Sequence, residues 1–271
     1  MLAPRSTTRT CVVRITTTEV EEEDEMVNEQ TMQKLYTMRL AAMALAWEEQ
    51  QGEAKLAKLS FDDRFGMLVD AEHIARDNRR LKRLLRAANL RIPSACMENV
   101  EASGKRGLDR QLVHDLGSIA WVGKNLNVLI TGATGVGKSY LSCALGQMAC
   151  RRGVRTMYRR LPRLLDELAL AKAEGTYRRV LAKIAKHDVL IIDDLGLGGG
   201  LKEPQRQDLL EVLDDRYRVH STVVTSQLPL KQWHEWIGDP TLADAILDRL
   251  VHNAHRVELK GPSRRKEAHA N

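Results

Sequence analysis

Aromatic residues, paired cysteines and long apolar runs are scarce or absent in this sequence. Aromatic side chains make up only 4% of its 271 residues, so we expect a core built mainly of aliphatic side chains. Its longest apolar run covers residues 40–47, far short of the roughly 20 residues that cross a bilayer. Residues 1–25 contain no signal-peptide h-region. Metal-finger spacing, which would suggest a zinc site, is absent from its four cysteines, Cys11, Cys96, Cys143 and Cys150. We therefore expect a cytoplasmic protein with reduced, inert thiols and no membrane partner.

Charge is distributed unevenly along the chain. Lys and Arg number 42 against 36 Asp and Glu, which gives a formal net charge of +6. Residues 1–25 hold three arginines and six acidic residues, so this stretch carries −3 and the rest of the chain +9. Because residues 1–31 show neither a helical nor a strand period, we predict a disordered leader that activity does not require.

Residues 32–93 have the three- and four-residue apolar spacing of helices. Ser60 and Asp63 predict the N-terminal cap of a second helix, and Pro93 ends a third helical segment. The apolar face expected for the first helix consists of Leu35, Met38, Ala42, Met43 and Leu45. The buried stripe expected for the third consists of Ile74, Leu81, Leu84 and Leu85.

The same region carries a basic stripe. Residues 76–91 hold seven Lys or Arg and a single acidic residue, Asp77. Solvated helix faces usually mix both signs of charge, and this one does not, so we predict contact with nucleic-acid phosphates. A simple solvated face is the alternative. The arginines assigned to DNA contact are Arg76, Arg79, Arg80, Arg83 and Arg86.

A phosphate-binding loop is the strongest motif of the chain. Residues 132–139 match G-x-x-x-x-G-K-[ST] without a gap, between a β-branched run at 127–131 and helical sequence at 140–150. Glycines let backbone N–H groups surround phosphate oxygens at the start of a helix. We expect Lys138 to reach the β- and γ-phosphates of ATP, and Ser139 to bind Mg²⁺. The expected nucleotide-binding residues are Gly132, Ala133, Thr134, Gly135, Val136, Gly137, Lys138, Ser139 and Tyr140.

A second apolar strand ends in two carboxylates. Residues 189–192 lead into Asp193 and Asp194. At the carboxyl end of a buried parallel strand, Asp193 would hold Mg²⁺, and Asp194 would orient or deprotonate the attacking water. A further predicted strand covers residues 221–225, and Thr225 and Gln227 at its end are placed to sense the γ-phosphate.

The order of these elements predicts an α/β fold. Strands at 127–131, 154–158, 189–192 and 221–225 alternate with helices at 161–173, 176–186 and 203–218. We expect a P-loop three-layer sandwich around a central parallel sheet with an added central strand, preceded by a small all-helical domain. The predicted parts are a leader at 1–31, a helical DNA-binding domain at 32–93, a connector at 94–126, an ATPase domain at 127–267 and a tail at 268–271.

Longer stretches carry a resemblance to a known family. Besides residues 132–139 and 191–194, they are YRRLP at 158–162, TSQLP at 225–229 and GDPTLADAILDRLVHN at 238–253. In these stretches the chain resembles the IstB-like ATPases, AAA+ helper proteins of insertion-sequence transposition that are related to DnaC-type helicase loaders. The resemblance covers roughly residues 35–267.

The resemblance implies an AAA+ fold, ATP hydrolysis, oligomerisation on DNA and regulation of a partner transposase. It assigns Arg249 as a finger that reaches a neighbouring subunit's nucleotide, an interaction worth about 10³–10⁵ in rate in related phosphate chemistry. Helix capping or pairing with an aspartate is the alternative for Arg249. Arg265 is assigned as a second phosphate sensor. Asp194 departs from the pattern of AAA+ proteins at large, in which Glu is usual, and we expect no large C-terminal helical lid of the kind found in many AAA+ proteins. The expected catalytic residues are thus Lys138, Asp194 and Arg249.

A second basic cluster extends the DNA prediction. Residues 151–163 hold six arginines and no acidic residue, and we assign Arg155, Arg159 and Arg160 to DNA contact. Solvent exposure and contact between subunits are the alternatives. Since no base-reading motif is present, we expect binding to duplex DNA that is largely independent of sequence. A DnaC-like helicase loader is the alternative function, and a phosphotransferase and a non-catalytic DNA-binding adaptor are further hypotheses.

Overall fold

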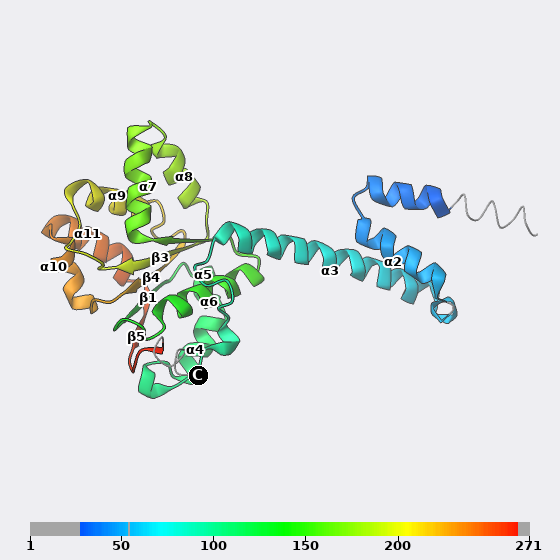
Figure 1. Ribbon diagram of the computed structural model, residues 1–271, viewed down its shortest axis with the longest axis horizontal. Coiled ribbons are helices and arrows are strands. Elements are labelled where there is room, and N and C mark those ends of the chain that lie inside the picture. The colour runs from blue at the N-terminus through cyan, green and yellow to red at the C-terminus, as the bar shows by residue number, and fades with distance from the viewer. Residues whose placement is uncertain (1–27, 54, 265–271) are drawn as a thin grey trace, which may run out of the picture. The chain divides into compact units, whose positions relative to one another are not determined.

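The computed structural model describes residues 28–53 and 55–264 (Figure 1). The predicted leader lies outside these residues except for 28–31, which belong to a helix at 28–37. Arg265 and the predicted tail also lie outside them. Within the described ranges, no helix is long and apolar enough to cross a membrane.

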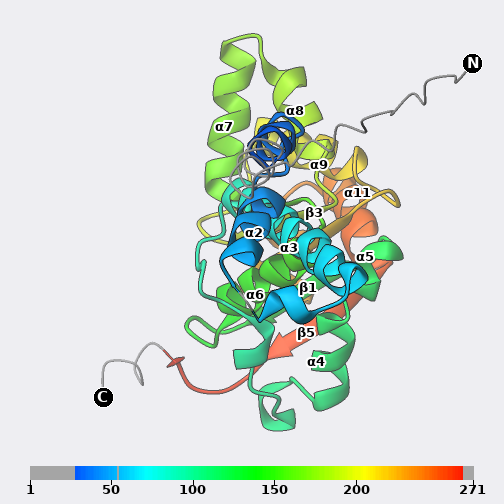
Figure 2. The same ribbon diagram turned by 90° about the vertical axis from the view of Figure 1, so that its right-hand side faces the viewer.

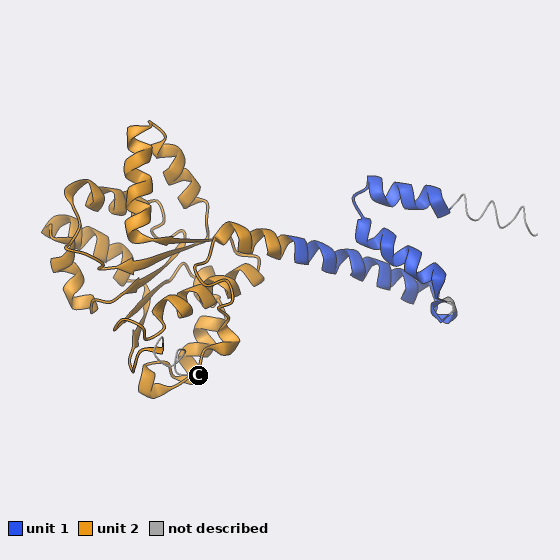
Figure 3. Ribbon diagram, in the orientation of Figure 1, with its two compact units in different colours: residues 1–79 blue, residues 80–271 orange. Residues whose placement is uncertain are grey.

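The chain divides into two compact units, residues 1–79 and 80–271 (Figure 3). The division falls inside one helix, α3 (Phe61–Ala88), and not at residue 93. Ser60 caps this helix as expected, since its Oγ accepts a hydrogen bond from the Asp63 amide at 3.2 Å. The predicted second and third helices are therefore one helix of 28 residues, because no residue between them interrupts the backbone ladder.

The first unit consists of the helix at 28–37, α2 (Ala41–Gly52), a 3₁₀ turn at Leu56–Lys58 and the start of α3. Its buried apolar residues include Leu35, Ala44 and Leu68. The prediction of one continuous apolar face over residues 35–45 is wrong, because the chain turns at Arg39, whose φ is 61°. Met38 and Leu45 are consequently 57% and 53% exposed.

The apolar stripe of α3 that we expected to be buried is only partly buried. Leu81, Leu84 and Leu85 pack against the core of the second unit. Ile74, in the first unit, is 58% exposed, so its predicted burial is wrong. In the part of α3 that belongs to the first unit, the almost fully buried residue is instead Glu72.

Glu72 holds the first turn of α2, which has no side-chain cap of its own. Its carboxylate accepts hydrogen bonds from the Ala42 and Met43 amides at 3.0 and 3.3 Å. It also accepts bonds from Arg76 and Arg79 at 2.9 and 2.8 Å. Burial opposes ionisation of Glu72, but these hydrogen bonds outweigh burial and lower the pKa of the carboxyl group below its ordinary value.

The second unit is built on a five-stranded parallel sheet. Its strands are β1 (Asn127–Gly132), β2 (Thr156–Arg160), β3 (Val189–Leu195), β4 (Ser221–Ser226) and β5 (Ala254–Leu259). Their order across the sheet is β2-β3-β4-β1-β5 (Figure 1). The predicted added strand is confirmed, because β4 lies between β1 and β3. β5 is not among the predicted strands; it is an edge strand whose residues include the polar His255, Arg256 and Glu258.

Helices cover both faces of this sheet, as Figures 1 and 2 show. Alternate strand residues point to opposite faces. Val128, Ile130 and Ile191 pack in the cluster beneath α6 (Lys138–Arg151), whereas Leu129 and Leu190 pack in a second cluster on the other face. The helices of that second face are α7 (Leu161–Ala173), α8 (Tyr177–Ala185), α9 (Glu203–Asp214), α10 (Trp233–Ile237) and α11 (Pro240–Val251). The predicted three-layer sandwich is confirmed. Two short helices, α4 (Arg110–Gly117) and α5 (Ala120–Gly123), precede β1.

Candidate nucleotide-binding site

The loop at residues 132–139 connects β1 to α6. Gly132, Gly135 and Gly137 have positive φ values of 141°, 87° and 104°, a region that side chains disfavour. The first turn of α6 has no side-chain cap, so its amide groups remain suited to an anion. Lys138 is almost fully buried, and its Nζ donates to the carbonyl oxygens of Gly132 and Ala133, both at 2.8 Å. A glycine-rich loop, an uncapped helix N-terminus and a buried lysine thus lie together, as a phosphate site requires.

A cavity of about 310 Å³ lies beside this loop. Loop residues 134–139 line one part of it, together with Asp194 and Gln227. The remaining wall has an apolar part, formed by Ile92, Val100, Leu108, Tyr140, Leu141 and Leu259, and a charged part, formed by Glu101, Arg106 and Arg264. A polar part for phosphates and an apolar part for a base together suit a nucleotide.

The chain that follows β5 packs against the loop. The Arg264 amide donates to the Gly135 carbonyl oxygen at 3.0 Å, and the side chain of Arg264 pairs with Glu101. A Cβ at Gly135 would collide with Ser263, and one at Gly132 would collide with the Leu259 carbonyl oxygen, so both positions require glycine. Arg265, the predicted second phosphate sensor, lies outside the described residues. The arginines that line the cavity are Arg106 and Arg264.

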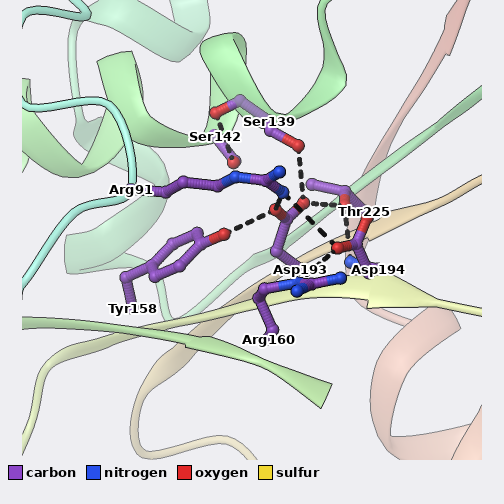
Figure 4. Close-up of polar contacts among 8 residues, drawn as sticks. All are labelled: Arg91, Ser139, Ser142, Tyr158, Arg160, Asp193, Asp194 and Thr225. Carbon is purple, nitrogen blue, oxygen red and sulfur yellow. Dashed lines mark hydrogen bonds and ion pairs between the residues drawn. The ribbon is translucent and has the colours of Figure 1, made fainter. Parts of the chain in front are cut away.

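Asp193 lies at the centre of a polar network at the end of β3 (Figure 4). The side chain is fully buried, and its two oxygens have different partners. Oδ1 accepts hydrogen bonds from Ser139 Oγ at 3.0 Å and from the Thr225 hydroxyl. Oδ2 accepts one from the Tyr158 hydroxyl at 2.6 Å and lies 3.4 Å from Arg91 Nη1.

Asp194 points toward the cavity and is 18% exposed. Its φ of 65° places the residue in the left-handed region, and its amide donates to Thr225 Oγ1 at 3.1 Å. Oδ2 of Asp194 accepts a hydrogen bond from Arg160 Nε at 2.7 Å and lies 3.5 Å from Arg91 Nη1. Two arginines thus flank two adjacent carboxylates (Figure 4).

The predicted sensor residues of β4 both reach this site. Thr225 bonds to Asp193 and Asp194, as described above. Gln227 accepts a hydrogen bond from the loop hydroxyl of Thr134 at 2.7 Å. The structure therefore brings the loop, the two aspartates and the end of β4 together.

Two residues of the network are not among the predicted site residues. Arg91 belongs to the basic stripe, and Tyr158 belongs to the predicted strand at 154–158 and to the resembling stretch at 158–162. Burial and the charge of Asp193 raise the pKa of Tyr158, so this phenol stays protonated as a hydrogen-bond donor. The position of Tyr158 on a strand next to the one that ends in Asp193 is the only sequence signal that could have indicated it.

The donor set fits Mg²⁺. Adjacent ligands of an octahedral Mg²⁺ with metal–oxygen distances of about 2.1 Å lie about 3 Å apart. Ser139 Oγ, at the end of the phosphate loop, and Asp193 Oδ1 are 3.0 Å apart. No group of three or more His, Cys, Asp or Glu side chains in the described part of the chain could hold a metal. Ser139 and Asp193 would leave most positions of a six-coordinate Mg²⁺ to phosphate oxygens and water.

Arg249 lies away from this cavity. Its guanidinium pairs with Asp214, donates to the Ala245 carbonyl oxygen at 3.0 Å and lies 3.9 Å from Asp248. Its carbonyl oxygen accepts a hydrogen bond from Asn127, the first residue of β1, at 2.9 Å. The phosphate loop follows the last residue of that strand, so Arg249 is at the opposite end of β1.

The arginines assigned to DNA contact fall into two groups. Arg155, Arg159 and Arg160 bond to Asp188, Glu167 and Asp194 at 2.8, 3.1 and 2.7 Å. Arg76 and Arg79 bond to Glu72, and Arg80 bonds to the Gly153 carbonyl oxygen at 3.3 Å. Within the described chain, Arg83 and Arg86 have no such partner and are exposed.

Comparison with known proteins gives consistent matches. A model of the family described as IstB-like ATP binding protein matches residues 33–271. An insertion sequence ATP-binding protein of Sinorhizobium fredii, named y4pL, is 46% identical over 241 residues, which cover 89% of this chain and 98% of that protein. The insertion sequence IS1162 ATP-binding protein of Pseudomonas fluorescens is 47% identical over 204 residues, which cover 75% of this chain and 88% of that one.

Solved structures show the same fold at lower identity. DnaI matches with a TM-score of 0.53 and 22% identity, covering 66% of this chain and 94% of its own. The DnaC helicase loader matches with a TM-score of 0.51 and 19% identity, covering 61% of this chain and 97% of its own. DnaA bound to AMPPCP and single-stranded DNA has a TM-score of 0.52 at 19% identity, covering 63% of this chain and 51% of its own. These likenesses confirm the predicted P-loop AAA+ fold.

Proposed function

This chain belongs to the IstB-like ATP-binding protein family, and from that premise we propose that it is a Mg²⁺-dependent ATPase that assembles on target duplex DNA and regulates or recruits a partner transposase. ATP binding stabilises a homo-oligomer on the DNA, and hydrolysis releases it. The relatives' names as insertion sequence ATP-binding proteins support the link to transposition.

The observation that carries the proposal is the contact between Asp193 and Ser139, which lines one cavity together with other residues of the phosphate loop. Ser139 and Asp193 would hold Mg²⁺, which when bound neutralises charge on the β- and γ-phosphate oxygens. Lys138 Nζ exchanges its bonds to two loop carbonyls for phosphate oxygens. The apolar wall of the cavity, which includes Ile92 and Tyr140, receives the base.

Asp194 is the residue we assign to the attacking water. It lines the cavity and is partly exposed, whereas Asp193 is fully buried. Oδ2 of Asp194 accepts one hydrogen bond from Arg160 and a longer one from Arg91, so Oδ1 is the acceptor for a water proton. Thr225 ties the Asp194 amide to Asp193, and Gln227 contacts the loop, so both transmit a change at the γ-phosphate to the end of β4.

Arg249 supports an oligomeric mechanism. A strand of six residues with a rise of about 3.3 Å per residue separates its backbone contact, Asn127, from the loop of the same chain. The guanidinium therefore cannot reach its own nucleotide, and we assign it to the nucleotide of a neighbouring subunit. Its partners Asp214 and Asp248 are half-exposed, so their bonds to Arg249 can be exchanged at a subunit contact.

DNA contact is assigned to the basic stripe of α3. Arg83 and Arg86 are exposed and carry positive charge without a described acidic partner. Arg76, Arg79 and Arg80 flank them and remain exposed in spite of their bonds. Arg76 and Arg79 share one carboxylate, that of Glu72, whereas Arg155, Arg159 and Arg160 each pair with a different one, so we leave the last three out of this assignment.

The test is binding of the full chain to fluorescent duplex and single-stranded DNA with ATP and Mg²⁺, at 50 and 200 mM salt. Five phosphate contacts predict a loss of affinity of about 10²–10³-fold over this range. Lys138→Ala should remove the dependence on ATP. A flat salt dependence, or a preference for single strands, contradicts the proposal, and the latter favours a helicase loader.

A further inference from the structure

The two oxygens of Asp193 are not equivalent. Oδ1 faces Ser139, the side on which a cation would lie, whereas Oδ2 faces Tyr158 and Arg91. A buried carboxylate that offered either oxygen to the metal would place its ligand less accurately. Groups bonded to the far oxygen of a ligating carboxylate orient it and tune its affinity. The partners of Oδ2 therefore help to aim Oδ1, in addition to the Thr225 hydroxyl that bonds to Oδ1 itself.

Tyr158 is the better placed of the two partners. It lies in β2 directly beside β3, and its ring is 6% exposed, so packing fixes the direction of the phenol. Its hydroxyl is 2.6 Å from Asp193 Oδ2, a short distance typical of a strong bond to a charged acceptor. The hydroxyl has one proton, and this bond uses it.

Arg91 is less directional. Its Nη1 lies 3.4 Å from Asp193 Oδ2 and 3.5 Å from Asp194 Oδ2, so one nitrogen is shared between two carboxylates. The side chain is 38% exposed. It supplies positive charge between the two aspartates, but it does not fix the plane of either.

We infer that Tyr158 is a positioning residue for the metal site: its hydroxyl holds Oδ2 of Asp193 and thereby directs Oδ1 toward Mg²⁺ beside Ser139. Figure 4 shows this arrangement, with the phenol and Ser139 on different sides of the carboxylate. The inference rests on the proposed function and adds a residue that touches neither metal nor nucleotide.

The test uses Mn²⁺ as the probe for the Mg²⁺ site. Mn²⁺ is titrated into full-length protein saturated with ADP, and the concentration of free Mn²⁺ is measured by electron paramagnetic resonance. For Tyr158→Phe, which removes only the hydroxyl, we expect affinity for Mn²⁺ about 10-fold weaker than in the wild type. Affinity for ADP measured in EDTA should stay within twofold, because neither the loop nor the apolar wall is altered.

Tyr177→Phe is the matched control. The Tyr177 hydroxyl donates to Asp208 Oδ1 at 2.7 Å, a similar bond whose residues do not line the nucleotide cavity. Its removal should leave Mn²⁺ affinity unchanged. Unaltered Mn²⁺ affinity in Tyr158→Phe overturns the inference, and so does an equal loss of ADP affinity in EDTA or failure to fold, which would show a structural role. If the wild type shows no ADP-dependent binding of Mn²⁺, the proposed function itself is overturned.

Discussion

Asp194 has a left-handed backbone conformation that few residues other than glycine adopt, with a φ of 65°. The bond from its amide to Thr225 helps to hold this conformation, which turns the side chain toward the cavity while Asp193 stays buried. Asp193 and Asp194, which are adjacent in β3, therefore have different roles. Asp193 points toward the metal ligand Ser139, and Asp194 points toward the space from which water attacks.

Asp194→Asn should separate nucleotide binding from hydrolysis. The amide keeps the size of the side chain but cannot accept a proton, so ATP turnover should fall by about 10²-fold or more. ATP affinity should change little, because Lys138 and Ser139 are intact. Lys138→Ala is the contrast and should lose binding as well. Radiolabelled ATP filter binding and phosphate release measure the two quantities, and normal turnover in Asp194→Asn would contradict the assignment.

Arg160 offers a second prediction at the residue scale. Its bond of 2.7 Å to Asp194 occupies a carboxylate oxygen that could otherwise accept a hydrogen from water. Arg160→Gln should therefore raise ATP turnover by up to about 10-fold. Its affinity for duplex DNA should stay within twofold. Arg83→Gln should do the reverse, lowering DNA affinity and leaving DNA-free turnover unchanged. A loss of DNA affinity in Arg160→Gln would contradict this prediction and indicate that Arg160 contacts DNA.

At the scale of elements, α2 depends on a carboxylate from α3. Glu72 caps its first turn, and the pKa of Glu72 is lowered below the ordinary 4.5 by hydrogen bonds from two amides and two arginines, against the effect of burial. A group with a lowered folded-state pKa stabilises the fold above its unfolded-state pKa, and the contribution is lost as pH falls through the folded-state value. Protection of α2 should thus be constant from pH 7 to about 5 and decline below about 4.5.

Hydrogen exchange of peptides covering α2 measures this effect. Glu72→Gln should expose the Ala42 and Met43 amides at pH 7, a destabilisation of about 1–3 kcal/mol. In this variant, the hydrogen-exchange protection of α2 should also decline much less between pH 5 and pH 3 than in the wild type. Asp70→Asn, an exposed carboxylate on the same helix, should behave like the wild type. Equal protection of α2 in Glu72→Gln and wild type would contradict the capping role.

The elements also show what local sequence can predict. The phosphate loop, the strand that ends in Asp193 and the added central strand depend on neighbouring residues, so spacing and composition predict them. Arg91 lies 102 residues from Asp193 in the chain, and Arg155 lies 33 from Asp188. No local pattern reports such pairs, so the arginine cluster at 151–163 resembled a free basic surface. β5 was missed for a related reason, because an edge strand with polar residues lacks the continuous apolar run of a central strand.

For the whole molecule, the sheet separates two parts of one ATPase centre. The phosphate loop follows one end of β1, and the helix that carries Arg249 is bonded to the other end through Asn127. If each nucleotide needs the Arg249 of a neighbour, a complete site exists only between subunits. Head-to-tail contacts of this kind build rings or helical filaments. ATP turnover should therefore rise more steeply than linearly with protein concentration.

Mixing two inactive variants tests this arrangement directly. Lys138→Ala lacks a working loop and Arg249→Ala lacks the finger, so each alone should hydrolyse ATP poorly. In a mixture, the loop of an Arg249→Ala subunit can meet the intact Arg249 of a Lys138→Ala subunit. An equimolar random mixture should restore about a quarter of wild-type turnover, because about one head-to-tail contact in four combines the two intact parts. A mixture of Lys138→Ala with Asp194→Asn is the control and should stay inactive, since both changes lie on the same side of the contact. Two outcomes would contradict the assignment: activity in Arg249→Ala alone, or no recovery on mixing when both variants still assemble on DNA. Either would show that Arg249 has only a structural role, through its bonds to Asp214 and the Ala245 carbonyl oxygen.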